Sequence, residues 1–188
     1  MVPTVDASWT VFVDRDGVVN RRVVGDYVRS LDQFELLPGA VDGLRLLSRH
    51  VRRVVIVTNQ QGIGKGLVTE DDLAEIHGWL VAQVEAAGGR VDAVVHCPHL
   101  SGDGCDCRKP GPGMARQASA LFPDIDLGRA VMVGDSAGDL GFARGLDIPA
   151  VLVTGTGGDG VPAAADAVAD SLLDAARLLT ATATAKTD

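Results

Sequence analysis

The chain has 188 residues, of which 46% are hydrophobic and 22% are charged. These proportions suit one folded core and exclude a wholly disordered chain. The formal net charge of −8 disfavours attraction to nucleic acid or to an anionic membrane, and no long uncharged apolar run is present. We therefore expect a cytoplasmic monomer that folds as a single domain over residues 1–188, with neither nucleic acid nor membrane as a partner.

Short apolar runs, rich in valine, alternate with amphipathic segments along the chain. The runs have the composition of strands buried on both faces, and the segments have the periodicity of helices. In chain order the prediction is strand 10–13, helix 41–49, strand 54–58, helix 69–87, strand 91–96, helix 114–121, strand 131–133, helix 140–144, strand 150–153, an edge strand near Ala167 and helix 171–179. This alternation predicts an α/β fold built on a parallel sheet with helices on both faces.

The helix predicted at 69–87 has the clearest end signals. Thr69 and Asp72 form a capping pair, and Gly88 follows the last turn. The glycine-rich stretch at 62–66 lacks the residue pattern of a phosphate-binding P-loop, so we expect an ordinary loop there. The Ala/Thr-rich end at 181–188 is expected to be a disordered tail.

Carboxylates directly follow two of the predicted strands. Asp14 and Asp16 come after the first strand, and Asp135 and Asp139 come after the fourth. If these strand ends are neighbours, the acids converge where open α/β sheets bind their ligands. Crowded carboxylates repel one another unless a cation is shared, and hard oxygen ligands with little enclosing loop suit Mg²⁺. The simpler interpretation is a turn or a helix cap, and Asp139 is a good candidate for a cap.

The second predicted strand also ends in polar residues. Thr58 offers a hydroxyl and Asn59 an amide, both of which can donate to phosphate oxygens. Such a sequence is commonly only a loop. Polar groups at the ends of alternating buried strands, occurring together, favour a binding site over that simpler interpretation.

The three cysteines are clustered rather than spread along the chain. Cys97 is followed by His99, and Cys105 and Cys107 come shortly after. An odd number of cysteines argues against a fully paired disulfide framework. Three thiolates and one imidazole complete a tetrahedral zinc site and leave no ligand position open. We therefore predict a structural Zn²⁺ in a loop at 97–107, rather than three free surface thiols.

A basic pair, Arg108 and Lys109, directly follows the last cysteine. An exposed pair is the simplest interpretation. A folded zinc loop would hold both side chains rigidly, however, which favours phosphate binding.

In order and type, these residues resemble the motifs of the haloacid dehalogenase-type phosphatases. That family has an Asp-x-Asp after the first strand, a Thr or Ser after the second, a Lys later, and an acidic Gly-Asp-x-x-x-Asp after the fourth. The matching residues are Asp14, Asp16, Thr58, Lys109, Asp135 and Asp139. The resemblance covers about residues 10–155 and implies the family's Rossmann-like, doubly wound sheet. The short segment between Asp14 and Thr58 leaves no room for a large cap domain.

The cysteine motifs narrow the resemblance to the branch of heptose bisphosphate and histidinol-phosphate phosphatases. Asn20, residues 25–28 and Phe34 look more like the heptose enzymes, whereas the short zinc loop looks more like the histidinol enzymes. Ser136 and Gln61 depart from the heptose pattern. The resemblance implies removal of the 7-phosphate of a heptose 1,7-bisphosphate. The alternatives are a histidinol-phosphate phosphatase and, more remotely, a non-catalytic module stabilised by zinc.

The resemblance also implies a mechanism. Asp14 would be the nucleophile that forms an aspartyl phosphate, and Asp16 would be the general acid and base, with a pKa raised by crowding with Asp14. Asp14, the backbone carbonyl of Asp16, and Asp135 would hold Mg²⁺, with Asp139 behind them.

Residues around this centre are expected to bind a small phosphorylated sugar. Thr58, Asn59 and Lys109 would contact the phosphate that is transferred, and Asn20 would support substrate binding. Arg108 would bind a second anionic group, which suits a substrate with two phosphates.

Overall fold

The computed structural model describes residues 2–155 and 165–181. Six parallel strands form one sheet with the order β3-β2-β1-β4-β5-β6. They are β1 (Thr10–Val13), β2 (Arg53–Asn59), β3 (Ala93–Cys97), β4 (Ala130–Gly134), β5 (Ala150–Val153) and β6 (Ala167–Ala169). This is the order of a doubly wound sheet, so the predicted fold class is confirmed.

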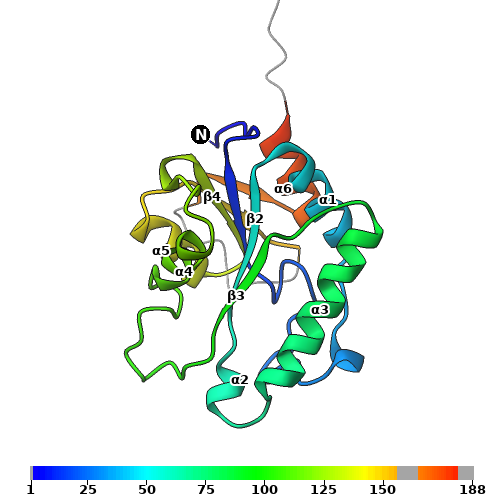
Figure 1. Cartoon of the computed structure of the whole chain (residues 1–188), viewed down its shortest axis with the longest axis vertical. Coiled ribbons are helices and arrows are strands. Elements are labelled where there is room, and N and C mark those ends of the chain that lie inside the picture. Colours follow the sequence, from blue (N-terminus) through cyan, green and yellow to red (C-terminus); the bar gives the residue numbers. More distant parts are fainter. Residues whose placement is uncertain (1, 156–164, 182–188) are drawn as a thin grey trace, which may run out of the picture.

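Helices cover both faces of the sheet (Figure 1). One face carries α1 (Ala40–His50), α3 (Glu70–Ala86) and α6 (Leu172–Thr180), and the other carries α4 (Gly113–Leu121) and α5 (Ala137–Gly145). Successive residues of β1 point to opposite faces, because side chains alternate along a strand. Val11 and Val13 pack into the core under α1, α3 and α6, whereas Phe12 packs into the core under α4 and α5. Burial on both faces explains why β1 is apolar from Val11 to Val13.

Most predicted elements are within one or two residues of the observed ones, but three differ in an informative way. The strand predicted at 91–96 is observed as Ala93–Cys97, because its ladder with β2 continues to the pair Cys97 and Asn59. The helix predicted to begin at 140 begins at Ala137, because Ser136 caps it. Part of the loop predicted at 62–66 is a short helix, α2 (Gln61–Gly64).

Two further short elements were not predicted. They are the 3-10 helices η1 (Leu31–Gln33) and η2 (Leu127–Arg129), each three residues long and therefore below the length at which a helical pattern shows in sequence. The segment from β1 to β2 is described throughout and contains only η1, α1 and loops, so it holds no separate cap domain. Of the predicted tail, residues 182–188 lie outside the described residues. No helix in the described part of the chain is long and apolar enough to cross a membrane.

Candidate active site

The candidate site lies at the carboxyl ends of β1, β2 and β4, which are adjacent in the sheet. Val13 of β1 pairs with Ile56 of β2 on one side and with Val133 of β4 on the other. The three strands therefore end at the same edge. Asp14 directly follows β1 and Asp135 directly follows β4, so the sheet register brings together two acids that are far apart in the sequence.

Three carboxylates converge at this edge. Asp14, Asp135 and Asp139 are buried, and each places one oxygen within 4.8 Å of the others. The Lys109 ammonium lies among them, 2.6 Å from Asp14 Oδ1 and 2.6 Å from Asp139 Oδ1. It also donates to the Val57 carbonyl at 2.8 Å. All three hydrogens of the ammonium group therefore have acceptors.

The charges in this cluster do not balance. Burial, and then repulsion from Asp139, raises the pKa of Asp14 to about 7, although Lys109 opposes the shift. Burial also raises the pKa of Asp135 to about 6, against the attraction of Arg22. Burial alone would lower the pKa of Lys109, but attraction by Asp139 and Asp14 outweighs burial and raises it. A further cation at this edge would stabilise the ionised acids.

Asp139 has a second partner at the start of α5. The Ser136 hydroxyl accepts from the Asp139 backbone N–H, and Asp139 Oδ2 accepts from the Ser136 N–H at 3.0 Å and the Asp135 N–H at 3.2 Å. Asp139 therefore takes part in the cap as predicted, but as the third helical residue of a capping box in which Ser136 is the N-cap. Glycine is required at Gly134, because a Cβ there would overlap the Asp139 side chain. Asp139 therefore fixes the start of the helix and the position of Lys109 together.

Asp135 faces a second cation, which comes from the loop after β1. Arg22 Nη2 donates to Asp135 Oδ1 at 2.6 Å and to the backbone carbonyl of Asp16 at 3.2 Å. The same loop approaches the other Asp135 oxygen at Gly17, where φ is +100° and a Cβ would overlap the carboxylate. Only glycine combines that backbone conformation with that close approach.

Asp16 is held by hydrogen bonds from four side chains, of which the Thr58 hydroxyl makes the longest, at 3.5 Å. Arg15 Nη2 donates to both carboxylate oxygens at 2.9 and 3.0 Å, Asn20 Nδ2 donates at 2.9 Å, and Gln60 Nε2 donates at 2.7 Å. Burial raises the pKa of Asp16, but the attraction of Arg15 and these hydrogen bonds outweigh burial, so the pKa is lowered. The predicted rise in the pKa of Asp16 through crowding with Asp14 is therefore wrong.

The end of β2 holds the loop that carries Lys109. Asn59 Nδ2 donates to the Lys109 carbonyl at 3.1 Å, and Asn59 Oδ1 accepts from the Lys109 N–H at 2.9 Å. The neighbouring Thr58 hydroxyl, which is almost fully buried, accepts from Gln60 Nε2 at 2.8 Å. Asn59 therefore joins β2 to the loop after the cysteines through two hydrogen bonds.

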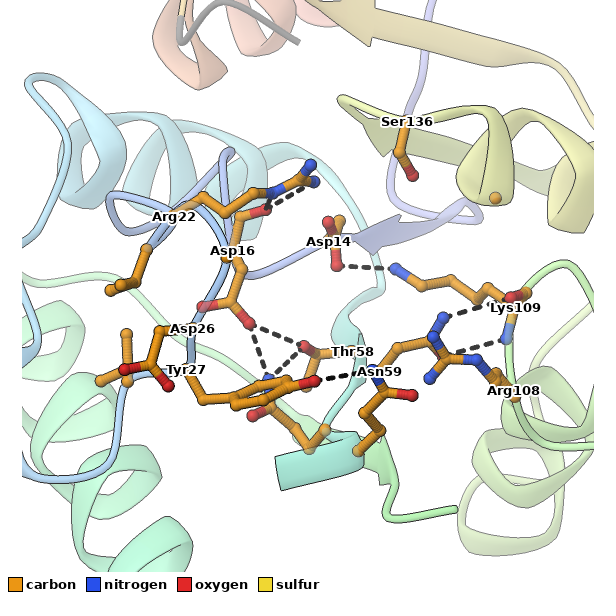
Figure 2. A pocket seen from close by; sticks show the side chains of 16 residues that line it. Asp14, Asp16, Arg22, Asp26, Tyr27, Thr58, Asn59, Arg108, Lys109 and Ser136 are labelled. Atoms are coloured by element: carbon orange, nitrogen blue, oxygen red, sulfur yellow. Dashed lines mark hydrogen bonds and ion pairs between the residues drawn. The ribbon is translucent and has the colours of Figure 1, made fainter. Parts of the chain in front are cut away.

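These residues line a pocket of about 540 Å³. Figure 2 shows Asp14 near its centre with Lys109 pointing at it, Arg22 and Tyr27 on the side of Asp16, and Arg108 beside Lys109. Arg108 Nη1 is buried and has no hydrogen-bond partner among the described residues. The pocket thus has a carboxylate at its centre and the side chain of Arg108 in its wall.

The four predicted zinc ligands form a compact cluster beside this pocket. Cys97 Sγ lies 3.1 Å from Cys107 Sγ and 3.6 Å from Cys105 Sγ, and His99 Nδ1 lies 3.1 Å from Cys107 Sγ. A tetrahedron with Zn–S bonds of about 2.3 Å has edges of about 3.8 Å, so the cluster is slightly tighter than a zinc site and has the right shape. Without a cation, burial raises the pKa of the Cys97 thiol to about 12. The donor set therefore fits zinc, with Nδ1 as the histidine ligand atom.

Of the residues predicted for the phosphate and magnesium site, the pocket is lined by Asp14, Asp16, Thr58, Asn59, Arg108 and Lys109. Three others lie behind the lining: Asp135 and Asp139 are buried beside Lys109 or Arg22, and Asn20 is fully buried against Asp16. Sequence reasoning missed Arg15, Arg22 and Gln60 as partners of the acids. Gln60 directly follows the predicted Thr58 and Asn59, and that adjacency was an available signal.

Comparison with known proteins agrees with this fold. A family model described as HAD-hydrolase-like matches residues 106–175. A protein of Mycobacterium tuberculosis named D-glycero-alpha-D-manno-heptose-1,7-bisphosphate 7-phosphatase is 42% identical over 170 residues, which cover 88% of each chain. The Pseudomonas aeruginosa D-glycero-beta-D-manno-heptose-1,7-bisphosphate 7-phosphatase is 42% identical over 148 residues, which cover 78% of this chain and 82% of the other.

A solved structure is also similar over almost the whole chain. It is the D,D-heptose 1,7-bisphosphate phosphatase from B. bronchiseptica, in complex with magnesium and phosphate. It has a TM-score of 0.81 at 36% sequence identity, and the match covers 91% of this chain and 97% of that one.

The fold, the carboxylate site and these similarities define the chain as a HAD-like hydrolase that acts on phosphate monoesters. Within that class, it belongs to the family of the heptose-1,7-bisphosphate 7-phosphatases.

Proposed function

We propose that this chain is a Mg²⁺-dependent phosphatase that removes the 7-phosphate of D-glycero-D-manno-heptose 1,7-bisphosphate. The observation that carries the proposal is the pairing of Asp14 with Lys109 at the centre of a pocket whose wall includes the cationic side chain of Arg108. Asp14 and Lys109 suit attack on one phosphate of the substrate, and Arg108 suits binding of the other. The relatives named above carry this activity in their names.

Asp14 is the nucleophile in the proposed mechanism. One of its carboxylate oxygens attacks phosphorus in line, an Asp14 Oδ–P bond forms, and the bond from phosphorus to the sugar oxygen breaks. Lys109 holds Asp14 Oδ1 at 2.6 Å, which directs the carboxylate and offsets the repulsion between two anions. Water then attacks the aspartyl phosphate and releases inorganic phosphate and free Asp14.

Asp16 is proposed to carry the proton in both steps. It protonates the leaving sugar oxygen and afterwards accepts the proton of the attacking water. Arg15 favours the ionised form, which is the form needed for the second step. An anionic phosphate ester bound next to Asp16 favours the protonated form, which is the form needed for the first step.

Three oxygen ligands fit the proposed magnesium site: a carboxylate oxygen of Asp14, the carbonyl of Asp16 and a carboxylate oxygen of Asp135. The fit is supported by Arg22, since one of its nitrogens contacts both the Asp16 carbonyl and Asp135 Oδ1. Those two oxygens are therefore spaced to hold one cationic group. When bound, Mg²⁺ would neutralise charge on the phosphate and on Asp14. Asp139 would stay with Lys109 and the α5 cap.

The proposed zinc is structural. Its ligands are Cys97, His99, Cys105 and Cys107, and the loop they close leads directly into Arg108 and Lys109. A loop with so few apolar residues has little other source of order. Reduced cysteines in a zinc site fit a reducing compartment, so the proposal keeps the expectation of a cytoplasmic enzyme. It also keeps the expectation of a monomer.

Substrate recognition is assigned to the pocket wall. Arg108 is proposed to bind the 1-phosphate, and Thr58 and Lys109 to surround the 7-phosphate. The amide of Asn59 is already bonded to the Lys109 backbone, so its proposed contribution to phosphate binding is through the position of Lys109. Asn20 is proposed to contribute in the same indirect way, through Asp16.

The proposal is tested by steady-state rates on three substrates: heptose 1,7-bisphosphate, heptose 7-phosphate and histidinol phosphate. A charge-assisted contact to the 1-phosphate should favour the bisphosphate over heptose 7-phosphate by roughly 10–100-fold in kcat/KM. Arg108→Gln should remove most of that preference and leave the rate on heptose 7-phosphate nearly unchanged. Faster turnover of histidinol phosphate than of either sugar would instead establish the alternative function.

A further inference from the structure

Arg22 makes three contacts to which the proposed mechanism gives no role of their own. Its Nη2 lies 2.6 Å from Asp135 Oδ1 and 3.2 Å from the Asp16 carbonyl oxygen, and its Nε lies 3.4 Å from the same carbonyl oxygen. The Asp135 side chain is only 2% exposed, whereas the Arg22 side chain is 39% exposed. A half-exposed guanidinium thus reaches down to a buried carboxylate, and a single nitrogen joins the two oxygens.

Those two oxygens are also two of the three ligands proposed for magnesium. Mg²⁺ binds oxygen at about 2.0–2.1 Å and requires near-octahedral geometry. An ion held by both oxygens would need the space next to them that Arg22 Nη2 occupies. The guanidinium and the ion would overlap there, and their positive charges would repel each other. Both cannot hold the pair of oxygens at once.

We propose that Arg22 is a positioning residue that holds the Asp16 carbonyl and Asp135 in place and competes directly with the divalent cation for them. This inference rests on the magnesium site in the proposed function. Arg22 already lines the pocket. Its side chain is exposed enough to swing away from Asp135 without disturbing the core. Binding of the ion would therefore release a guanidinium into the space that receives the anionic substrate.

The neighbouring arginine provides a matched control. Arg21 pairs with Glu35 through bonds of 2.8 and 2.9 Å, and both side chains are more than 60% exposed. Arg21 does not line the pocket. Substituting glutamine for Arg21 or for Arg22 changes the net charge equally, but only the second change removes the contact with the ligand oxygens.

The experiment is calorimetric titration of Mg²⁺ into protein that retains its zinc and has been dialysed free of magnesium. Arg22→Gln should bind Mg²⁺ about tenfold more tightly than the unmodified protein, because a charge-assisted contact no longer opposes the ion. The Mg²⁺ affinity of Arg21→Gln should stay within about twofold of that of the unmodified protein. The second readout is the thermal unfolding midpoint. Without magnesium it should be lower in Arg22→Gln than in the unmodified protein, and saturating Mg²⁺ should remove most of this difference between the two proteins.

The outcomes separate this inference from the proposed function. Tighter binding in Arg22→Gln alone supports competition. Equal or weaker binding in a folded Arg22→Gln overturns the inference and leaves the magnesium site in place. Equal tightening in both variants also overturns it, since net charge would then explain the change. If no variant binds Mg²⁺, the magnesium site is wrong and the inference fails with it.

Discussion

The buried guanidinium of Arg15 donates from Nη1 to His77 Nε2 at 3.0 Å. Arginine has no acceptor, so His77 must accept through Nε2, carry its proton on Nδ1 and stay neutral. Burial, together with the charge of Arg15, lowers the pKa of His77 to about 3. Through Nη2 the same guanidinium fixes Asp16. A neutral histidine on α3 therefore supports the residue assigned to proton transfer.

This relationship predicts a pH-dependent loss of stability. The folded pKa of His77 is below its unfolded value, so its contribution is fully present above about pH 6.5 and is lost as the pH falls towards 3. The part of the loss that depends on His77 should be about 2 kcal/mol between pH 6.5 and 5. It is measured by urea unfolding as the difference in pH slope between the unmodified protein and His77→Gln, whose carbonyl can still accept from Arg15. The raised pKa values of Asp14 and Asp135 stabilise the fold as the pH falls, but they act in both proteins and cancel in this difference. His50→Gln, at an exposed position on α1, should have the slope of the unmodified protein, and equal slopes in His77→Gln and His50→Gln would contradict a neutral His77.

Asp14→Asn should abolish turnover. An amide cannot form the aspartyl phosphate, so we expect kcat to fall by at least about a thousandfold. The protein should remain folded, as judged by circular dichroism. Asp42→Asn, which removes an exposed partner of Arg45 on α1, should leave kcat unchanged. Residual activity above a few per cent in pure Asp14→Asn would assign the nucleophile to another residue.

Removal of zinc should damage both stability and activity. We expect about one zinc per chain by elemental analysis, and a zinc-selective chelator should lower the thermal midpoint by at least about 5 °C. Activity should fall as well, because the loop positions Arg108 and Lys109. Added zinc, but not added magnesium, should restore both. A zinc-free protein with full activity would show that the four ligands have no structural role.

Asn59→Ala should reduce activity without removing zinc. The change breaks both hydrogen bonds to the Lys109 backbone, and a small displacement of that lysine from Asp14 should cost roughly 10–100-fold in kcat/KM. Asn59→Asp keeps the acceptor for the Lys109 N–H, so it should hold the Lys109 backbone better than Asn59→Ala does. A drop in zinc content in Asn59→Ala would mean that the substitution unfolds the loop instead.

The sequence was sufficient for the sheet and for the acids at its edge, for a clear physical reason. Strands buried on both faces must be continuously apolar, so each run marks a strand, and Asp14 and Asp135 mark where two strands end. The cysteine cluster was predictable for a similar reason, because its ligands are close in sequence as well as in space.

Contacts that depend on tertiary packing were not predictable in the same way. Arg22 and Asp135 are 113 positions apart, and no local pattern indicates that they pair. The sign of the pKa shift of Asp16 depends on Arg15, whose side chain turns away from Asp14 towards α3. The sequence spacing suggests that Asp14 raises the pKa of Asp16, whereas in the folded protein burial raises it and Arg15 outweighs burial.

Removal of the 7-phosphate can be observed directly by following hydrolysis of heptose 1,7-bisphosphate by phosphorus NMR with Mg²⁺ present. We predict that the 7-phosphate signal is replaced by inorganic phosphate while the 1-phosphate signal persists, and that Asp14→Asn produces no change. Loss of the 1-phosphate first, or no hydrolysis by protein loaded with both metals, would contradict this prediction.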